Sequence, residues 1–113
     1  MHDTLLTWNE FLNVEIRTGT ILQAEVFKEA RKPAYKLVID FGSCGIRRSS
    51  AQITHLYQPD DLVGKTIVAV VNFPPKQIGP FMSECLVLGS VSEEGVVTLL
   101  CPDHPVANGL RIS

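Results

Sequence analysis

Apolar and polar residues alternate along two segments of the chain, residues 14–27 and residues 35–41. A two-residue period is typical of a half-buried β-strand, so both segments are predicted to be strands. The apolar sides carry Ile16, Thr18, Thr20, Leu22, Ala24 and Val26 in the first segment, and Tyr35, Leu37, Ile39 and Phe41 in the second. Gly19 interrupts the first segment, where the missing side chain allows the bulge or bend that a small closed barrel needs.

Shorter segments complete the strand pattern. Residues 46–49 follow a glycine-rich turn and predict a third strand, while residues 85–88 and 96–100 predict further strands around a turn at residues 92–95. Residues 66–71 are apolar almost throughout, so both faces of that strand are predicted to be buried. In a small barrel one face points outward, and we expect another part of the assembly, such as a second subunit, to cover it. From residue 102 the chain is predicted to be an extended surface tail.

Two short helices are predicted. Thr7 and Glu10 have the spacing of a capping box, and the helix that follows would bury an apolar stripe against its own barrel or a partner subunit. A second helix is expected to begin after Ser50 and to end before Pro59, followed by a turn at residues 60–64.

The order of these elements predicts an all-β fold in a single domain, residues 1–113. Three strands, a helix and two more strands describe a five-stranded Greek-key OB-fold barrel, here with a short N-terminal helix and extra C-terminal strands. An SH3-like barrel is the alternative, but that fold does not place a helix between the third and fourth strands.

Composition narrows the function classes. The 113 residues are 45% hydrophobic and 19% charged, and no apolar run approaches the ~18 residues of a membrane span. The N-terminus lacks the features of a secretory signal, so a cytoplasmic protein without membrane insertion is expected. The three cysteines have no paired spacing and the three histidines are scattered, so no metal and no cofactor are predicted.

An enzyme is not expected. The chain has no nucleophile elbow, no phosphate-binding loop and no dinucleotide fingerprint. The paired carboxylates at residues 60–61 and 93–94 fall in predicted turns, where solvated turn residues explain them better than acid–base catalysis does.

Basic residues concentrate between residues 28 and 48. Six lysines and arginines stand there against two acidic residues, which leaves about +4 on a chain whose net charge is −2. Such a patch can bind nucleic-acid phosphates, or it can be a set of solvated strand and loop faces.

A proline-rich loop at residues 72–80 carries the other candidate site. Apolar side chains on a stiffened loop lose little entropy on binding, which favours a preorganised contact surface for polypeptides. The expected peptide-binding residues are Phe73, Ile78, Phe81 and Met82. The alternative is that a phenylalanine of this loop folds back and plugs the end of the barrel.

Several motifs occur together in a familiar order. Residues 11–21 (FLNVEIRTGTI), 57–65 (YQPDDLVGK) and 72–76 (NFPPK, followed by Ser83-Glu84) resemble the tRNA-binding OB domains, which are appended to some tRNA synthetases and also occur as free dimers. Residues 49–54 (SSAQIT), 71–75 (VNFPP) and 83–89 (SECLVLG) resemble the CsaA branch of that family.

The resemblance implies a homodimeric, export-related chaperone that binds unfolded or pre-secretory polypeptides, with the export machinery as a further partner. The alternative that it implies is a tRNA-binding module. Residues expected to contact tRNA, from the motifs and the basic stretch, are Arg17, Arg31, Lys32, Lys36, Arg47, Asn72, Lys76 and Ser83. The expected dimer interface comprises Trp8, Phe11, Leu12, Val68 and Val70.

Overall fold

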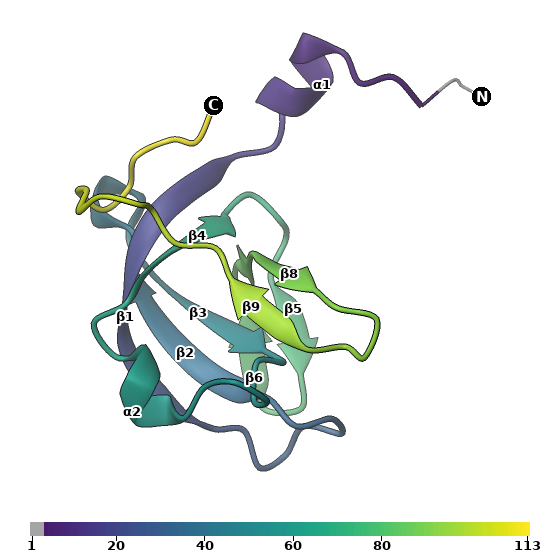
Figure 1. Cartoon of the computed structure of the whole chain (residues 1–113), viewed down its shortest axis with the longest axis vertical. Coiled ribbons are helices and arrows are strands. Elements are labelled where there is room, and N and C mark those ends of the chain that lie inside the picture. Colours follow the sequence, from purple (N-terminus) through teal and green to yellow (C-terminus); the bar gives the residue numbers. More distant parts are fainter. Residues whose placement is uncertain (1–3) are drawn as a thin grey trace.

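An antiparallel five-stranded sheet curls into a nearly closed barrel and forms the body of the molecule (Figure 1). The computed structural model describes residues 4–113. The strands of the sheet, in the spatial order β3-β2-β1-β4-β7, are β1 (Ile16–Val26), β2 (Tyr35–Asp40), β3 (Ile46–Ala51), β4 (Thr66–Val70) and β7 (Leu86–Val87). Two hairpins follow β4, namely β5 (Lys76–Ile78) with β6 (Phe81–Ser83), and β8 (Gly89–Val91) with β9 (Val97–Leu99). The predicted OB-type barrel with extra C-terminal strands is confirmed.

Strand β1 joins the two halves of the barrel. Its first half pairs with β4 and its second half with β2, and the register shifts between Ile21 and Gln23. The predicted bulge therefore exists, but it lies at Leu22 and not at Gly19. Gly19 serves close packing instead, because a Cβ atom there would lie 2.6 Å from the Phe41 ring.

The side of β1 that faces the barrel interior differs from the predicted one. Ile21 is fully buried, whereas Leu22 and Val26 are exposed on the outer surface. Thr18 is buried as well, but on the outer face, under the C-terminal tail. The alternation predicted for β2 is confirmed, and its inward residues join the main core: Tyr35, Leu37, Ile39 and, just beyond the strand, Phe41.

The helix between the third and fourth strands exists at a different place from the predicted one. Ser50 belongs to β3, and helix α2 (Pro59–Leu62) begins at Pro59, where we expected a helix to have ended. Proline suits the first helical position because its missing N–H would have no intrahelical partner there. The Gln58 backbone N–H donates to Asp61 Oδ2 at 3.0 Å, which secures this helix start.

The predicted loop at residues 72–80 is in part a hairpin. Its prolines lie outside the strands, and Gly79, at φ 56°, occupies the turn between β5 and β6. Phe81 then packs in a small second core with Phe27 and Ala34. The smaller elements are the 3₁₀ turn η1 (Gly42–Cys44) and helix α1 (Trp8–Leu12), whose predicted capping box is present.

The C-terminal tail lies along the outer face of β1 and is fixed there by Thr18. The Thr18 hydroxyl donates to the Ala107 carbonyl at 2.8 Å and accepts from the Leu110 N–H at 2.9 Å. The Thr18 backbone exchanges two further bonds with Leu110 and Gly109. Every polar atom of this buried residue is therefore paired with the tail.

The tail also explains the burial of β4. Both faces of this strand are buried, as predicted, and its outward residues are Val68 and Val70. Val68 lies opposite Thr18 and shares an apolar depression with Leu110 and Ile112 of the tail. At Val68 the same chain thus supplies the cover for which a second subunit was one expectation.

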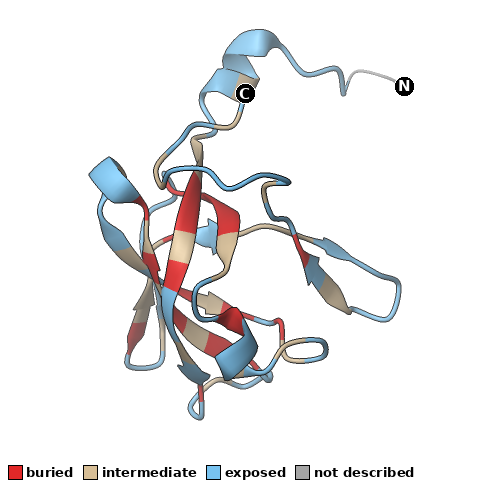
Figure 2. Cartoon of the chain, turned by 60° about the vertical axis from the view of Figure 1, so that its left-hand side comes forward, coloured by how far each residue is buried: buried red, intermediate tan, exposed pale blue. Residues whose placement is uncertain are grey.

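Helix α1 projects from the barrel and leaves its surface exposed (Figure 2). Its connection to β1 is braced by the Asn72 side chain, which donates to the Asn13 carbonyl at 2.7 Å and accepts from the Glu15 N–H at 3.0 Å. Arg111 donates to the Leu12 carbonyl at 2.7 Å. The position of the helix is therefore set by two distant parts of the chain, at Asn72 and Arg111.

Thr18→Val is expected to destabilise the protein by about 1–3 kcal/mol, because it leaves the Ala107 carbonyl and the Leu110 N–H without their partner. Urea unfolding measures the change. Thr98→Val, at an exposed position of β9, is the matched control and should be close to neutral. Equal stabilities of the two variants would contradict the anchoring role of Thr18.

Candidate functional site

A groove of about 400 Å³ lies where the β5–β6 hairpin meets the edge of β3 and the start of β7. It joins Phe73 and Ile78, from the expected peptide-binding set, with Lys76 and Ser83, from the expected tRNA-binding set. Its lining residues are Ser50, Gln52, Phe73, Pro74, Lys76, Ile78, Ser83, Cys85 and Leu86. The motifs at residues 49–54, 71–76 and 83–89 thus converge on one surface of the fold.

The apolar part of the groove is open to solvent. Phe73 is 54% exposed and Leu86 is 49% exposed, while Ile78 is half-buried beneath them. Pro74 and Pro75 follow Phe73 and restrict the backbone that carries it. A large apolar side chain held in this way can cover a partner's apolar group at little entropic cost.

The polar part of the groove comes from β3 and β6. The Ser50 backbone N–H donates to Ser83 Oγ at 3.1 Å, so Ser83 holds the edge of β3 as well as lining the groove. Lys76 is exposed on β5 and carries the one charge among the lining residues. Four lining residues were not among the expected binding residues, although all of them lie in the motifs that resemble the CsaA branch: Ser50, Gln52, Pro74 and Leu86.

The groove is held in shape by the segment that follows β6. The Glu84 N–H donates to the Arg48 carbonyl at 2.7 Å, and Glu84 Oε1 accepts from the Arg48 N–H at 2.9 Å. The buried Ser49 hydroxyl donates to the Cys85 carbonyl at 2.9 Å. These contacts fix the hairpin against the unpaired edge of β3.

The thiol at the base of the groove is not a nucleophile. Burial raises the pKa of Cys85 to about 11, so the thiol stays protonated at neutral pH. A protonated, buried thiol is chemically inert and contributes packing. Its presence adds no catalytic chemistry to the groove.

The other two expected peptide-binding residues lie differently. Phe81 is 7% exposed and makes an edge-to-face contact with Phe27, at 5.3 Å between ring centroids. The alternative that a phenylalanine folds back thus holds for Phe81 but not for Phe73. Met82, its neighbour, is half-buried.

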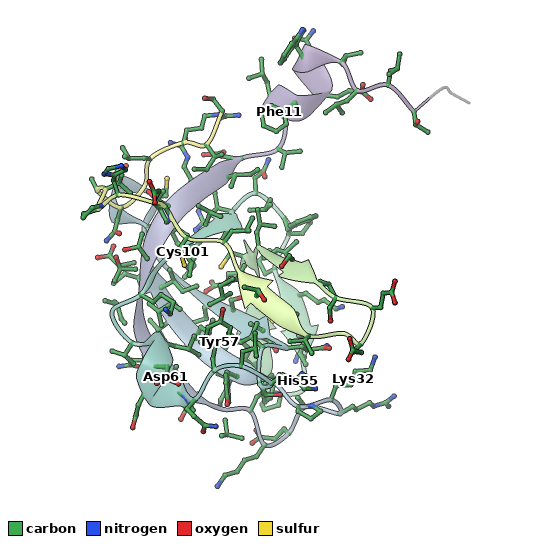
Figure 3. The ribbon with its side chains drawn as sticks, in the orientation of Figure 1. Phe11, Lys32, His55, Tyr57, Asp61 and Cys101 are labelled. Carbon is green, nitrogen blue, oxygen red and sulfur yellow. The ribbon has the colours of Figure 1, made fainter. Side chains whose placement is uncertain are left out.

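The basic residues divide into two groups. Arg31 and Lys32 are exposed in the β1–β2 connection. Lys32 lies at the end of the barrel away from Phe11 of α1 (Figure 3). Lys36 lies 5.9 Å and Arg48 5.4 Å from the centre of the Phe81 ring, beside a cavity of about 490 Å³ on the outer sheet face. Each of these two cations also lies near a carboxylate, Glu25 at 3.5 Å and Glu84 at 3.9 Å.

Besides Ser83, three of the expected RNA-contacting residues form hydrogen bonds within the fold. Arg17 pairs with Glu15 at 2.9 Å and donates to the Gly109 carbonyl. Arg47 donates to the Val71 carbonyl at 2.8 Å, and Asn72 braces α1. Arg17 and Asn72, which lie in the family-like motifs, therefore have a structural reason for their positions.

Residues 4–113 contain no group of three side chains placed to hold a metal ion. In the same part of the chain, no helix is long and apolar enough to cross a membrane.

Known proteins share the sequence motifs and the fold of this chain. The family described as "Putative tRNA binding domain" matches residues 16–111. The crystal structure of the chaperone CsaA from Bacillus anthracis is 54% identical, with a TM-score of 0.93, covering 97% of this chain and 100% of that chain. The methionyl-tRNA-synthetase-related protein from Pyrococcus horikoshii is 29% identical, with a TM-score of 0.87 and full coverage of both chains.

The curated relatives are larger proteins. The methionine–tRNA ligase of Methanoculleus marisnigri is 37% identical over 103 residues, which are 91% of this chain and 15% of the ligase. The chain spans about 15% of the length of the first curated relatives that it matches. The predicted resemblance to tRNA-binding OB domains and to their CsaA branch is confirmed, and the chain belongs to the tRNA-binding domain family.

Proposed function

We propose that the protein is a cytoplasmic, non-catalytic and ATP-independent chaperone that binds unfolded or pre-secretory polypeptides and serves protein export. The observation that carries this proposal is the groove in which the exposed Phe73 stands beside Ile78 and Leu86. Unfolded chains expose apolar side chains, and burying one fully contributes about 1.5–3 kcal/mol. A few such contacts give reversible binding without an energy source.

The mixed lining of the groove supports a polypeptide ligand. Ser50, Gln52 and Ser83 place polar groups beside the apolar wall, as a chain with both apolar side chains and amide groups requires. The high similarity to the crystal structures of two CsaA chaperones, at 54% and 52% identity, points the same way.

Phe73→Asp is expected to weaken binding of an unfolded polypeptide at least about tenfold, because it removes the exposed apolar anchor. Fluorescence anisotropy with a labelled, reduced and unfolded polypeptide measures the affinity. Leu56→Asp is the matched control, since Leu56 is 55% exposed but lies outside the groove. Unchanged affinity of Phe73→Asp, with an intact circular dichroism spectrum, would refute this site.

The proposed assembly is a homodimer that buries the N-terminal helix. Trp8 is 86% exposed and Leu12 is 57% exposed, on an element that projects from the barrel. The preceding Leu5 and Leu6 are also exposed. A contiguous apolar patch of this kind marks a protein interface. Since Val68 and Val70 are buried within the described chain, helix α1 rather than β4 supplies the main apolar contact that we propose.

Trp8→Glu is therefore expected to shift the protein from dimer to monomer in sedimentation at micromolar concentration, with its circular dichroism unchanged. Val63→Glu, at a site 52% exposed, is the control and should leave the dimer intact. A wild-type protein that sediments as a monomer would contradict the proposal.

The family match and the exposed cations favour a second candidate function, binding of tRNA. Arg31, Lys32 and Lys76 are exposed, and Lys36 and Arg48 border one cavity. Such residues would contact backbone phosphates and release counterions on binding. In this second function the proposed partner is tRNA recognised through its backbone and shape.

For tRNA, Lys32→Gln should reduce the slope of log affinity against log salt by about 1, because one phosphate contact is lost. Filter binding over a series of salt concentrations measures the slope. Lys65→Gln, outside the basic stretch, is the control. An affinity that does not depend on salt would exclude this mode of RNA binding.

A further inference from the structure

The C-terminal tail holds the one place in the sequence where an asparagine precedes a glycine, Asn108-Gly109. Such a pair deamidates readily, because glycine has no Cβ atom to hinder its own backbone nitrogen. That nitrogen attacks the asparagine Cγ, and the new N–Cγ bond closes a succinimide ring. The side-chain nitrogen leaves as ammonia, with the proton that the backbone nitrogen gives up. Water then opens the ring at either carbonyl and yields aspartate or isoaspartate, so water is the only co-reactant.

The attacking nitrogen of this reaction is held in the folded protein. The Gly109 N–H donates to the Thr18 carbonyl at 2.7 Å, so the proton that must leave is engaged. The Gly109 carbonyl accepts from Arg17 Nη1 at 3.1 Å, and the Thr18 hydroxyl accepts from the next N–H, that of Leu110, at 2.9 Å. Both sides of the Gly109 backbone are therefore fixed to β1.

The side chain that would be attacked is held as well. The Thr20 hydroxyl donates to Asn108 Oδ1 at 2.7 Å, which binds this side chain to β1. The Asn108 backbone lies against Gly42, since a Cβ atom at Gly42 would come within 2.7 Å of the Asn108 carbonyl oxygen. Asn108 and Gly109 are only half-buried, so solvent water is at hand once these contacts open.

The isoaspartate product does not fit the closed tail. In isoaspartate the main chain runs through the side chain, which adds a CH₂ group to it. Thr18 binds the Ala107 carbonyl at 2.8 Å and the Gly109 N–H at 2.7 Å, so the length of chain between these two groups is fixed. A longer chain separates at least one of them from Thr18.

The aspartate product adds a negative charge where one already lies. Thr20 stands opposite Asp40 in the β1–β2 ladder, and Asp40 Oδ1 accepts from the Gly42 N–H at 2.8 Å. Gly42 also borders Asn108, so a new carboxylate at position 108 lies near that of Asp40. Like charges on neighbouring positions repel each other and weaken the docking of the tail.

We propose that Asn108 is a deamidation site gated by the tail. It reacts when the tail lifts from Thr18, and the product then keeps the tail from closing. A brief opening is thereby converted into a lasting one. The depression that Val68 shares with Leu110 and Ile112 loses its cover, so an aged molecule presents apolar surface that a new one buries.

The gate is tested at Gly109, because hydrogen exchange and deamidation both require its N–H to be released. A synthetic peptide of residues 104–113 gives the two ungated rates. We expect the folded protein at neutral pH to react at least about tenfold more slowly than the peptide, with the two slowing factors equal within about threefold. Peptide mapping by mass spectrometry follows deamidation, and NMR follows exchange of the Gly109 amide. Deamidation as fast in the folded protein as in the peptide would overturn the gate.

Loosening the tail supplies a second test. Thr18→Val should raise the deamidation rate at least about fivefold, whereas Thr98→Val, at an exposed position of β9, should leave it unchanged. If Thr18→Val does not fold, Arg17→Gln replaces it, since that change removes the bond to the Gly109 carbonyl. An unchanged rate in the folded variant would overturn control by the tail.

Trypsin, which cuts after Arg111, measures release of the tail. In the closed tail the Ile112 N–H donates to the Ile16 carbonyl at 2.9 Å, which protects this bond. Deamidated protein is separated by ion exchange through its added negative charge, and it should be cut at least about tenfold faster than unmodified protein. Asn108→Asp has the charge without the longer main chain and should show an intermediate rate. Equal cleavage of deamidated and unmodified protein would overturn release of the tail.

Discussion

The unpaired edges of a five-stranded sheet are the constraint on which the rest of the structure depends. In the part of the chain that the structure describes, β3 and β7 end the sheet and do not pair with each other. The Ser83-Glu84-Cys85 segment bridges them, through Ser83 to Ser50, Glu84 to Arg48 and Cys85 to Ser49. Because an exposed edge invites pairing with other chains, the way in which it is covered decides both stability and function.

The C-terminal tail covers apolar surface on the outer face of the barrel. Apolar outer residues of β4 need cover, and the buried Thr18 aligns the tail that provides it. Several polar residues that were expected to contact tRNA serve this internal bracing. Arg17 holds the tail, Arg47 holds the end of β4, and Asn72 holds the entry to β1. A residue can therefore belong to a functional motif for a structural reason.

The functional surface combines two chemistries. Phe73, Ile78 and Leu86 supply apolar area, while Lys76 and the edge of β3 supply charge and hydrogen bonds. An unfolded polypeptide presents apolar side chains and amide groups, and a nucleic acid presents phosphates. The same barrel scaffold can thus support a polypeptide-binding branch and a tRNA-binding branch, with the balance between apolar and basic side chains deciding between them.

By itself, the sequence determined the all-β class, the order of the main strands and the region of the site, because periodicity and turn residues are local properties. It could not place the bulge at Leu22, start α2 at Pro59, or show that Phe81 turns inward while Phe73 stays exposed. Those outcomes depend on contacts between distant residues, such as Phe81 with Phe27 and Gly19 with Phe41. Which backbone groups of β3 remain unpaired was likewise decided by the tertiary structure, since Ser83 and Glu84 reach that edge only after the barrel has folded.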